Sequence, residues 1–130
     1  MSLIFTNGCF DIIHRGHIDL LEFCSTLGET VVVGLNSDKS VKNLKGENRP
    51  IFSQEDRKKV LESLKFVNKV IIFDEDTPYN VIKSLKPDII VKGGDYKESE
   101  VVGNDLCKVV IFKYVDGYST TKTIKNISDR

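Results

Sequence analysis

Residues 3–17 read LIFTNGCFDIIHRGH. This stretch opens with the apolar run Leu3–Phe5, which is short and continuous, as strands covered on both faces are. A polar turn containing Gly8 follows, and His14 to His17 then stand where a helical pattern begins. A buried strand leading through a tight turn into a helix indicates the first unit of an α/β sheet.

The remainder of the chain repeats this alternation of apolar runs and helical patterns. Four further runs read as buried strands: Val31–Val33, Val70–Phe73, Asp88–Val91 and Val109–Phe112. We therefore predict a Rossmann-like α/β fold, with a parallel five-stranded sheet and helices on both faces, and residues 1–130 as a single domain. Ligands of such sheets bind at the carboxyl ends of the strands, near the switch in strand order.

Capping signals place the helices between these strands. Leu20, Leu21 and Cys24 hold helical spacing, and Gly28 is placed to end that first helix. Further N-caps are expected at Ser53, at Thr77 with Pro78 in the first helical position, and at Ser119.

Composition excludes several classes of protein. The 19 Lys and Arg balance the 19 Asp and Glu, so no global charge favours nucleic acid or a membrane as a partner. No apolar run approaches the ~18 residues of a membrane span. We expect no signal peptide, because the polar residues Thr6, Asn7 and Gly8 come before any long apolar run could form. The three cysteines are widely spaced, which predicts neither a disulfide framework nor a structural metal. We expect a cytoplasmic enzyme.

The first candidate site is the pair His14 and His17, with Gly16 between them. Two imidazoles beside the free N–H groups of a helix N-terminus form an anion site. A core role for His17 is the alternative, because His17 shares a helical stripe with Leu21 and Cys24. The pairing, directly after a strand, favours the anion site.

The second candidate is the basic stretch from Lys39 to Arg49. Its cations, among them Lys42 and Lys45, are expected on a loop that folds over a polyphosphate, and the alternative is a solvated basic loop. Arg57 faces inward from the next helix, either toward an anionic ligand or into a salt bridge within the protein.

Two more polar clusters follow later strands. Lys92-Gly93-Gly94-Asp95 comes after the fourth strand, where paired glycines let a base or a phosphate approach the backbone or simply form a turn. Residues 117–122 offer three neighbouring hydroxyls at a helix start, which bind phosphate or serve as a helix cap. The chain lacks a P-loop and a G-x-G-x-x-G motif, so neither common nucleotide fingerprint applies.

Two of these stretches resemble known signatures. Residues 8–17 resemble the G-x-F-D-x-x-H-x-G-H signature of the cytidylyltransferase-like nucleotidyltransferases, and residues 119–122 resemble their I-S-T-T-K motif. The resemblance covers essentially the whole chain. Residues 44–46, 75–78 and 91–96 are most similar to D-glycero-β-D-manno-heptose 1-phosphate adenylyltransferases, which occur free-standing or as the C-terminal half of a bifunctional kinase.

The resemblance implies transfer of AMP from ATP to a sugar 1-phosphate of the heptose type, with release of pyrophosphate and formation of an ADP-sugar for lipopolysaccharide. It implies catalytic roles for His14, His17 and Lys45. Nucleotide-binding roles fall on Cys9, Phe10, Asp11, His14, Gly16, His17, Arg49, Gly93, Asp95, Ser119, Thr120 and Thr121, with Lys42 and Arg57 as further candidates. Mg²⁺ is expected through the substrate phosphates, with Asp11 as a candidate ligand, and a homodimer is expected.

Two alternatives stay open. One is a cytidylyltransferase acting on glycerol 3-phosphate or a similar polyol or amino-alcohol phosphate; the other is a nucleotide-binding module without turnover. Residues 114–121 lack the arginine of the R-T-E-G-I-S-T-T segment typical of glycerol-3-phosphate cytidylyltransferases, which favours ATP. The segment from Asn104 to Lys108 is shorter than in heptose adenylyltransferases. A change in this segment can alter the acceptor pocket or the dimer surface, so the resemblance does not fix which sugar phosphate is the acceptor.

Overall fold

The computed structural model describes residues 2–113 and 120–129, with the side chains of Thr120 and Lys122 excepted. Its strands form one parallel sheet in the order β3-β2-β1-β4-β5. The strands are β1 (Leu3–Gly8), β2 (Thr30–Asn36), β3 (Lys69–Phe73), β4 (Ile89–Gly93) and β5 (Lys108–Phe112). The predicted five-stranded parallel sheet is confirmed, and the order reverses direction between β1 and β4.

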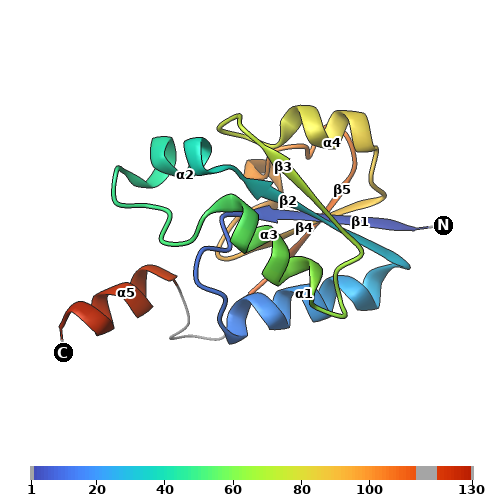
Figure 1. Cartoon of the computed structure of the whole chain (residues 1–130). Coiled ribbons are helices and arrows are strands. Elements are labelled where there is room, and N and C mark those ends of the chain that lie inside the picture. The colour runs from blue at the N-terminus through green and yellow to red at the C-terminus, as the bar shows by residue number, and fades with distance from the viewer. Residues whose placement is uncertain (1, 114–119, 130) are drawn as a thin grey trace.

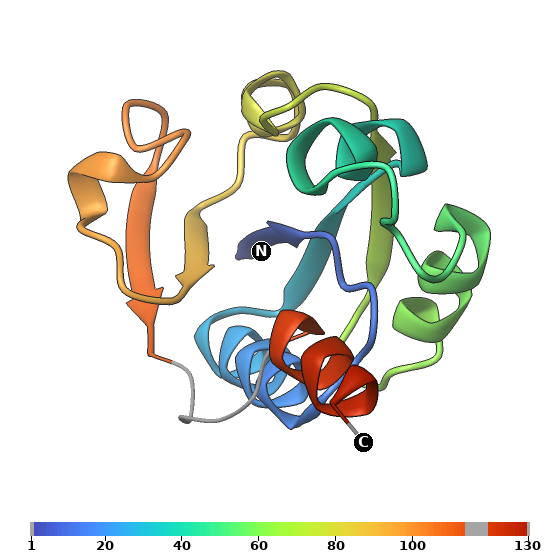
Figure 2. The same ribbon diagram turned by 90° about the vertical axis from the view of Figure 1, so that its left-hand side faces the viewer.

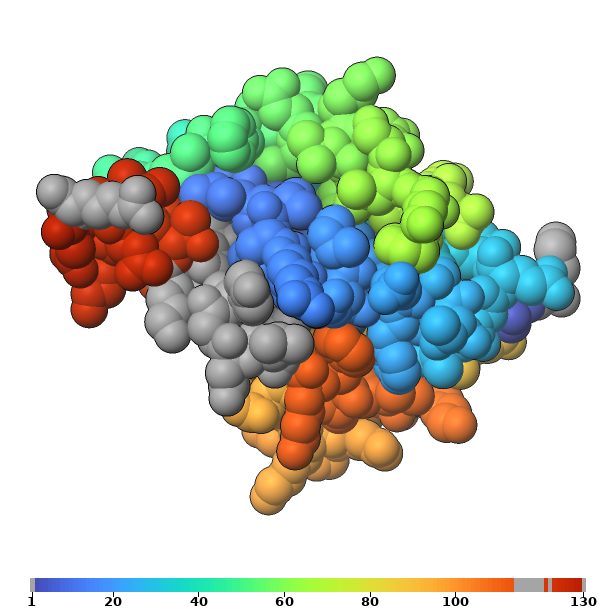
Figure 3. Space-filling view, turned by 90° about the horizontal axis from the view of Figure 1, so that it is seen from below, coloured from blue at the N-terminus to red at the C-terminus, as the bar shows by residue number. Residues whose placement is uncertain are grey.

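Helices cover both faces of this sheet (Figure 1). They are α1 (Arg15–Leu27), α2 (Asp38–Lys45), α3 (Gln54–Glu62), α4 (Tyr79–Leu85) and α5 (Thr120–Ser128), with a short 3₁₀ helix, η1, over Glu98–Glu100. Turned by 90°, the structure shows α4 and α1 on opposite sides of the strands (Figure 2). From below, α1 lies beside α3, and α5 is at one end of the molecule (Figure 3).

The two faces of the sheet bury separate hydrophobic clusters. Ile4 packs on the face covered by α1 and α3, together with Leu20 and Leu61. Its neighbour Phe5 points to the other face and packs with Ile82 of α4. Both Ile4 and Phe5 are fully buried. Burial on both faces explains why the strands read as continuous apolar runs instead of alternating ones.

The basic stretch after β2 differs from its prediction. Residues 38–45 form α2 and not a loop. The hydroxyl of Ser37 caps the helix by accepting a hydrogen bond from the Ser40 N–H at 3.1 Å, and Gly46 ends it with φ of +103°. These caps were present in the sequence, but Val41 is the only buried apolar residue of the helix, so hydrophobic periodicity gave no signal.

The start of α4 also differs by one residue. The N-cap is Pro78 and not Thr77, because the Pro78 carbonyl accepts the first helical hydrogen bond from the Ile82 N–H at 2.9 Å. Ser53 caps α3 as predicted, accepting from the Asp56 N–H, and Gly28 ends α1. The Ser119 cap lies outside the described residues. In the described part of the chain, no helix has the length and apolar character needed to cross a membrane.

Candidate active site

A cavity of about 610 Å³ opens at the carboxyl edge of the sheet, where the strand order switches between β1 and β4. This is the position predicted for a ligand in such a sheet. The cavity is lined by residues at or near the ends of these elements: Asn7 and Gly8 at the end of β1 with Cys9 and Phe10 beyond it, His14 and His17 at the start of α1, Asn36 at the end of β2, Leu44 and Lys45 at the end of α2 with Arg49 beyond it, Asp76–Pro78 before α4, Lys92 and Gly93 at the end of β4 with Tyr96 beyond it, Glu100–Val102, and Thr121 of α5.

The two histidines cap the N-terminus of α1 reciprocally. His14 is the N-cap, and its Nδ1 accepts a hydrogen bond from the Gly16 N–H at 3.0 Å. The Nδ1 of His17 accepts from the His14 N–H at 3.2 Å, and the two rings stack with centroids 3.8 Å apart. Because each Nδ1 is an acceptor, the proton of each neutral ring sits on Nε2. The H-x-G-H spacing therefore builds a capping box made of two imidazoles.

Burial keeps these imidazoles neutral. Burial, together with a smaller effect of the field of His14, lowers the pKa of His17 from 6.5 to about 3. Burial also lowers the pKa of His14. Both rings line the cavity, while His17 also packs against Phe10 with centroids 5.1 Å apart. His17 thus has both the core contact and the cavity position that the sequence left as alternatives.

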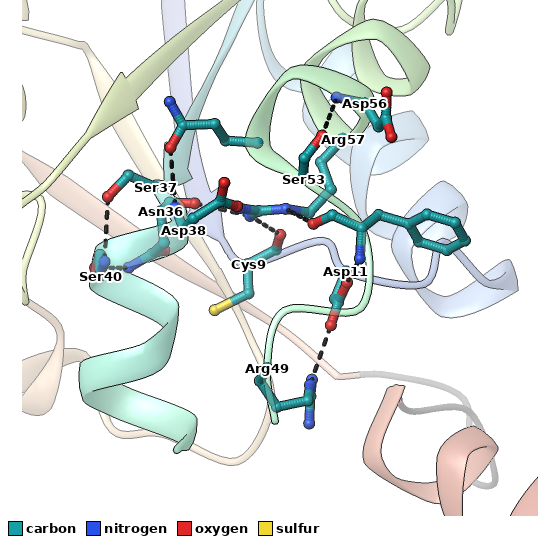
Figure 4. Close-up of polar contacts among 12 residues, drawn as sticks. Cys9, Asp11, Asn36, Ser37, Asp38, Ser40, Arg49, Ser53, Asp56 and Arg57 are labelled. Carbon is teal, nitrogen blue, oxygen red and sulfur yellow. Dashed lines mark hydrogen bonds and ion pairs between the residues drawn. The ribbon is translucent and has the colours of Figure 1, made fainter. Parts of the chain in front are cut away.

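Arg57 is buried and forms a salt bridge within the protein, which was one of the two roles that the sequence predicted for it. Its guanidinium is 1% exposed and donates to the carbonyl oxygens of Cys9 at 2.8 Å and Asn36 at 2.7 Å. It also donates to the Phe52 carbonyl at 3.0 Å and pairs with the Asp38 carboxylate at 2.8 Å (Figure 4). Arg57 therefore does not line the cavity; it joins the ends of β1 and β2 to the start of α2.

Asp11 is likewise an internal anchor, which corrects its assignment as a metal ligand. Phe10 has φ of +45°, a conformation rare for a residue with a side chain, and the chain turns there so that Asp11 points inward. The Asp11 carboxylate is fully buried and accepts from the N–H groups of Ile51 and Phe52, at 2.8–2.9 Å, and from Nε of Arg49 at 3.0 Å. With its oxygens so occupied, Asp11 does not fit a Mg²⁺ ligand. It holds Arg49 at the cavity instead (Figure 4).

The structure brings most of the predicted site residues to one cavity. Those that line it are Cys9, Phe10, His14, His17, Lys45, Arg49, Gly93 and Thr121. Gly16 is buried behind it and supplies the N–H that His14 accepts. The exposed residues Lys42 and Asp95 are not among the lining residues. Ser119 lies outside the described residues, and of Thr120 only the helical backbone is described.

Lys92 and Tyr96 line the cavity, but sequence reasoning gave them no role. The Nζ of Lys92 lies 4.9 Å from the centroid of the Tyr96 ring. Burial lowers the pKa of Lys92, the nearby Lys45 lowers it further, and Cys9 opposes the shift. The sequence interpretation assigned ligand binding to the glycines that follow Lys92. A lysine at the carboxyl end of a predicted strand, where ligands of such sheets bind, also indicates a binding residue.

The shortened segment after Gly103 lies away from the cavity. Gly103 has φ of +94°, and a Cβ there would stand 2.7 Å from Ile90, so the turn is packed tightly on the sheet. Asp105 accepts a hydrogen bond from the Tyr79 hydroxyl at 2.7 Å, which ties the segment to α4. None of residues 103–108 lines the cavity.

Comparisons with known proteins agree with this geometry. The cytidylyltransferase-like family model matches residues 5–127. The bifunctional protein HldE of Campylobacter concisus is 59% identical over 98% of this chain, and that of Campylobacter fetus is 55% identical over 97%. The chain spans only 27% and 28% of the length of these two relatives.

A solved structure is similar over almost its whole length. The lipopolysaccharide core biosynthesis protein of Thermoplasma volcanium superimposes with a TM-score of 0.74 and 30% identity, over 92% of this chain and 99% of that one. The family match runs from β1, through the histidine pair, into α5. This chain belongs to the cytidylyltransferase-like family.

Proposed function

We propose that this chain is an adenylyltransferase that transfers AMP from ATP to a sugar 1-phosphate of the heptose type. The products would be pyrophosphate and an ADP-sugar. The observation that carries the proposal is the pair of neutral imidazoles at the α1 N-terminus, facing a cavity that Lys45 and Arg49 also line. The identity to HldE and the name of the Thermoplasma volcanium protein favour a sugar phosphate of lipopolysaccharide as the acceptor.

The reaction needs little from the protein beyond positioning and charge. An oxygen of the acceptor phosphate attacks the α-phosphorus of ATP, and the bond from that phosphorus to the pyrophosphate oxygen breaks. The acceptor oxygen is already anionic, so neither a general base nor a protein nucleophile is required. Catalysis then consists of holding the two phosphates in line and stabilising the charge that builds on the α-phosphate and on the leaving group.

The residues around the cavity supply such stabilisation. The Nε2–H groups of His14 and His17 donate to phosphate oxygens, and the N-terminus of α1 adds its partial positive charge. Lys45 and Arg49 provide cations from the segment that Asp11 anchors. Thr121 lines the cavity from α5, and with Ser119 and Thr120 it would hold the β- and γ-phosphates.

The remaining parts of the proposal are Mg²⁺, a cytoplasmic location and a homodimer. Mg²⁺ prefers polyphosphate oxygens and would arrive on ATP, with the phosphates as its ligands. The cytoplasmic location follows from the proposed use of ATP as the donor, because ATP is a cytoplasmic substrate. The homodimer rests on the family resemblance alone.

Pyrophosphate release tests this function directly. The purified chain is incubated with ATP or CTP and with each of heptose 1-phosphate, glycerol 3-phosphate and flavin mononucleotide. We expect release with ATP and heptose 1-phosphate, at least about tenfold faster than with any other pair, since one well-placed polar contact discriminates by that much. Preference for CTP with glycerol 3-phosphate would instead identify a cytidylyltransferase. Nucleotide binding without release for any acceptor would identify a binding module.

A further inference from the structure

Lys92 is a half-buried cation inside the cavity. It belongs to the end of β4, next to the switch in strand order, and lines the cavity together with Gly93 and Tyr96. Its ammonium sits 4.9 Å from the centroid of the Tyr96 ring, within the range of a cation–π contact. The ring therefore restrains an ammonium that would otherwise sample several rotamers.

The protein offers this ammonium no anionic partner in the described part of the chain. The ion pairs found among residues 2–113 and 120–129 join Arg15 to Asp19, Arg49 to Asp11, and Arg57 to Asp38. Burial lowers the pKa of Lys92; the nearby Cys9 opposes that shift, and the field of a second lysine, Lys45, adds to it. Lys45 and Lys92 line the same cavity, where two like charges repel each other, and an anion bound between them relieves that repulsion.

We propose that Lys92, with Lys45, binds the phosphate of the acceptor. This inference rests on the proposed function, because it assigns the second anion of that reaction. His14, His17 and Thr121 are the groups suited to the triphosphate, whereas Lys92 enters the cavity from β4. In-line attack places the acceptor phosphate on the side of the α-phosphorus opposite the leaving pyrophosphate. A pair of lysines there offsets the repulsion between two approaching phosphates.

The test separates binding of the acceptor from binding of ATP. Lys92→Met keeps the aliphatic stem and removes the charge, and Lys83→Met removes an exposed charge on α4 as the matched control. We expect Lys92→Met to raise KM for heptose 1-phosphate about 10- to 100-fold, the effect of losing a hydrogen bond to a charged group, and to change the Kd of ATP less than about threefold. Lys92→Arg should restore most of the affinity, and Lys83→Met should match the wild type.

The role of Tyr96 gives a second measurement. Tyr96→Phe keeps the ring under the ammonium, so it should raise KM for heptose 1-phosphate less than Tyr96→Leu does. Tyr96→Leu removes the ring and should raise that KM about three- to tenfold, as loss of a cation–π contact does. An equal rise in the Kd of ATP in Lys92→Met would overturn the proposal and place Lys92 on the nucleotide. Unchanged constants for both substrates would also overturn it.

Turnover by the wild-type chain is measured first, so that the two proposals fail separately. If the wild type releases no pyrophosphate, the proposed function is wrong. Calorimetric titration of heptose 1-phosphate into wild type and Lys92→Met, each loaded with a non-reactive ATP analogue, then tests the lysine alone. Binding that is equal in the two proteins, or absent from both, contradicts the acceptor site.

Discussion

At the scale of the residue, the two histidines serve the fold and the site with different nitrogens. Each Nδ1 accepts a backbone N–H at the start of α1, which leaves Nε2 as the donor of each neutral ring. The sequence could predict that the two rings gather at a helix start. It could not predict their reciprocal capping, because the choice of nitrogen depends on the rotamers that Phe10 and the α1 backbone impose.

Removal of one ring should therefore cost catalysis more than affinity. We expect His17→Ala to lower kcat about 10²- to 10³-fold, the effect of losing one preorganised donor. The rate of pyrophosphate release at saturating ATP measures this, and circular dichroism checks the fold. A normally folded variant with an unchanged kcat would show that His17 has no role in the reaction.

The same burial makes the stability of the protein depend on pH. The pKa of His17 falls from 6.5 to about 3 on folding, so between these values the unfolded chain binds a proton that the native protein does not. The free energy of unfolding should therefore decrease as pH falls from 6.5 toward 3, by at most about 1.4 kcal/mol per pH unit from this group. Denaturation in urea across that range measures the slope. His17→Gln should reduce it, and an equal slope in both proteins would contradict the assignment.

A substitution of Asp11 can distinguish two roles of its carboxylate, namely holding Arg49 at the cavity and binding Mg²⁺. Asp11→Asn leaves one carboxamide where two carboxylate oxygens accept from Ile51, Phe52 and Arg49. We expect KM for ATP to rise about tenfold because Arg49 is no longer held at the cavity. The Mg²⁺ concentration that gives half-maximal rate should not change. A large increase in that concentration would restore Asp11 as a metal ligand.

At the scale of the element, burial decides what the sequence reveals. The strands were predictable because both faces of the sheet are covered, which makes each strand a continuous apolar run. Helix α2 was not, because Leu44 is 49% exposed and the helix is specified mainly by its caps. Arg57, which joins α2 to β1 and β2, was recognisable as an inward cation, but its carbonyl partners come from segments far apart in sequence.

Because Arg57 joins these elements by hydrogen bonds, its substitution should mainly lower the free energy of unfolding. Arg57→Met leaves the carbonyl groups of Cys9 and Asn36 without their donor, so we expect a loss of roughly 3–5 kcal/mol in the free energy of unfolding. Lys59→Met on the exposed side of α3 is the matched control and should change stability by less than about 0.5 kcal/mol. Urea denaturation gives both values, and similar stability in the two variants would contradict the role of Arg57.

At the scale of the whole molecule, the sheet order places the site and α5 completes it. None of the described residues of α5 belongs to either hydrophobic cluster, yet Thr121 lines the cavity. The strand–helix alternation predicted the edge of the sheet at which the cavity opens. The lining of the cavity also includes Lys92, Tyr96 and residues 100–102, which come together only through packing of the folded chain.

A chain that ends at Lys113 should separate folding from nucleotide binding. We expect its Tm to stay within about 5 °C of the full chain, since the clusters are intact. Its Kd for ATP should rise at least about tenfold through loss of the hydroxyls near Thr121. Calorimetry measures both quantities, with Ile127→Gln, a change at an exposed site of α5, as the full-length control. Undiminished affinity would exclude α5 from the nucleotide site.

The proposed function places the transfer of AMP to a sugar 1-phosphate in the cavity at the β1–β4 switch. Its most direct test is ³¹P NMR of the wild-type chain with ATP, Mg²⁺ and heptose 1-phosphate, because the spectrum resolves both products in one sample. We predict that pyrophosphate and the diphosphate signals of an ADP-sugar grow together in equal amounts, and that His17→Ala slows both alike. Pyrophosphate without the ADP-sugar, or unchanged ATP in a sample that binds it, would show that the chain does not transfer AMP to this sugar phosphate.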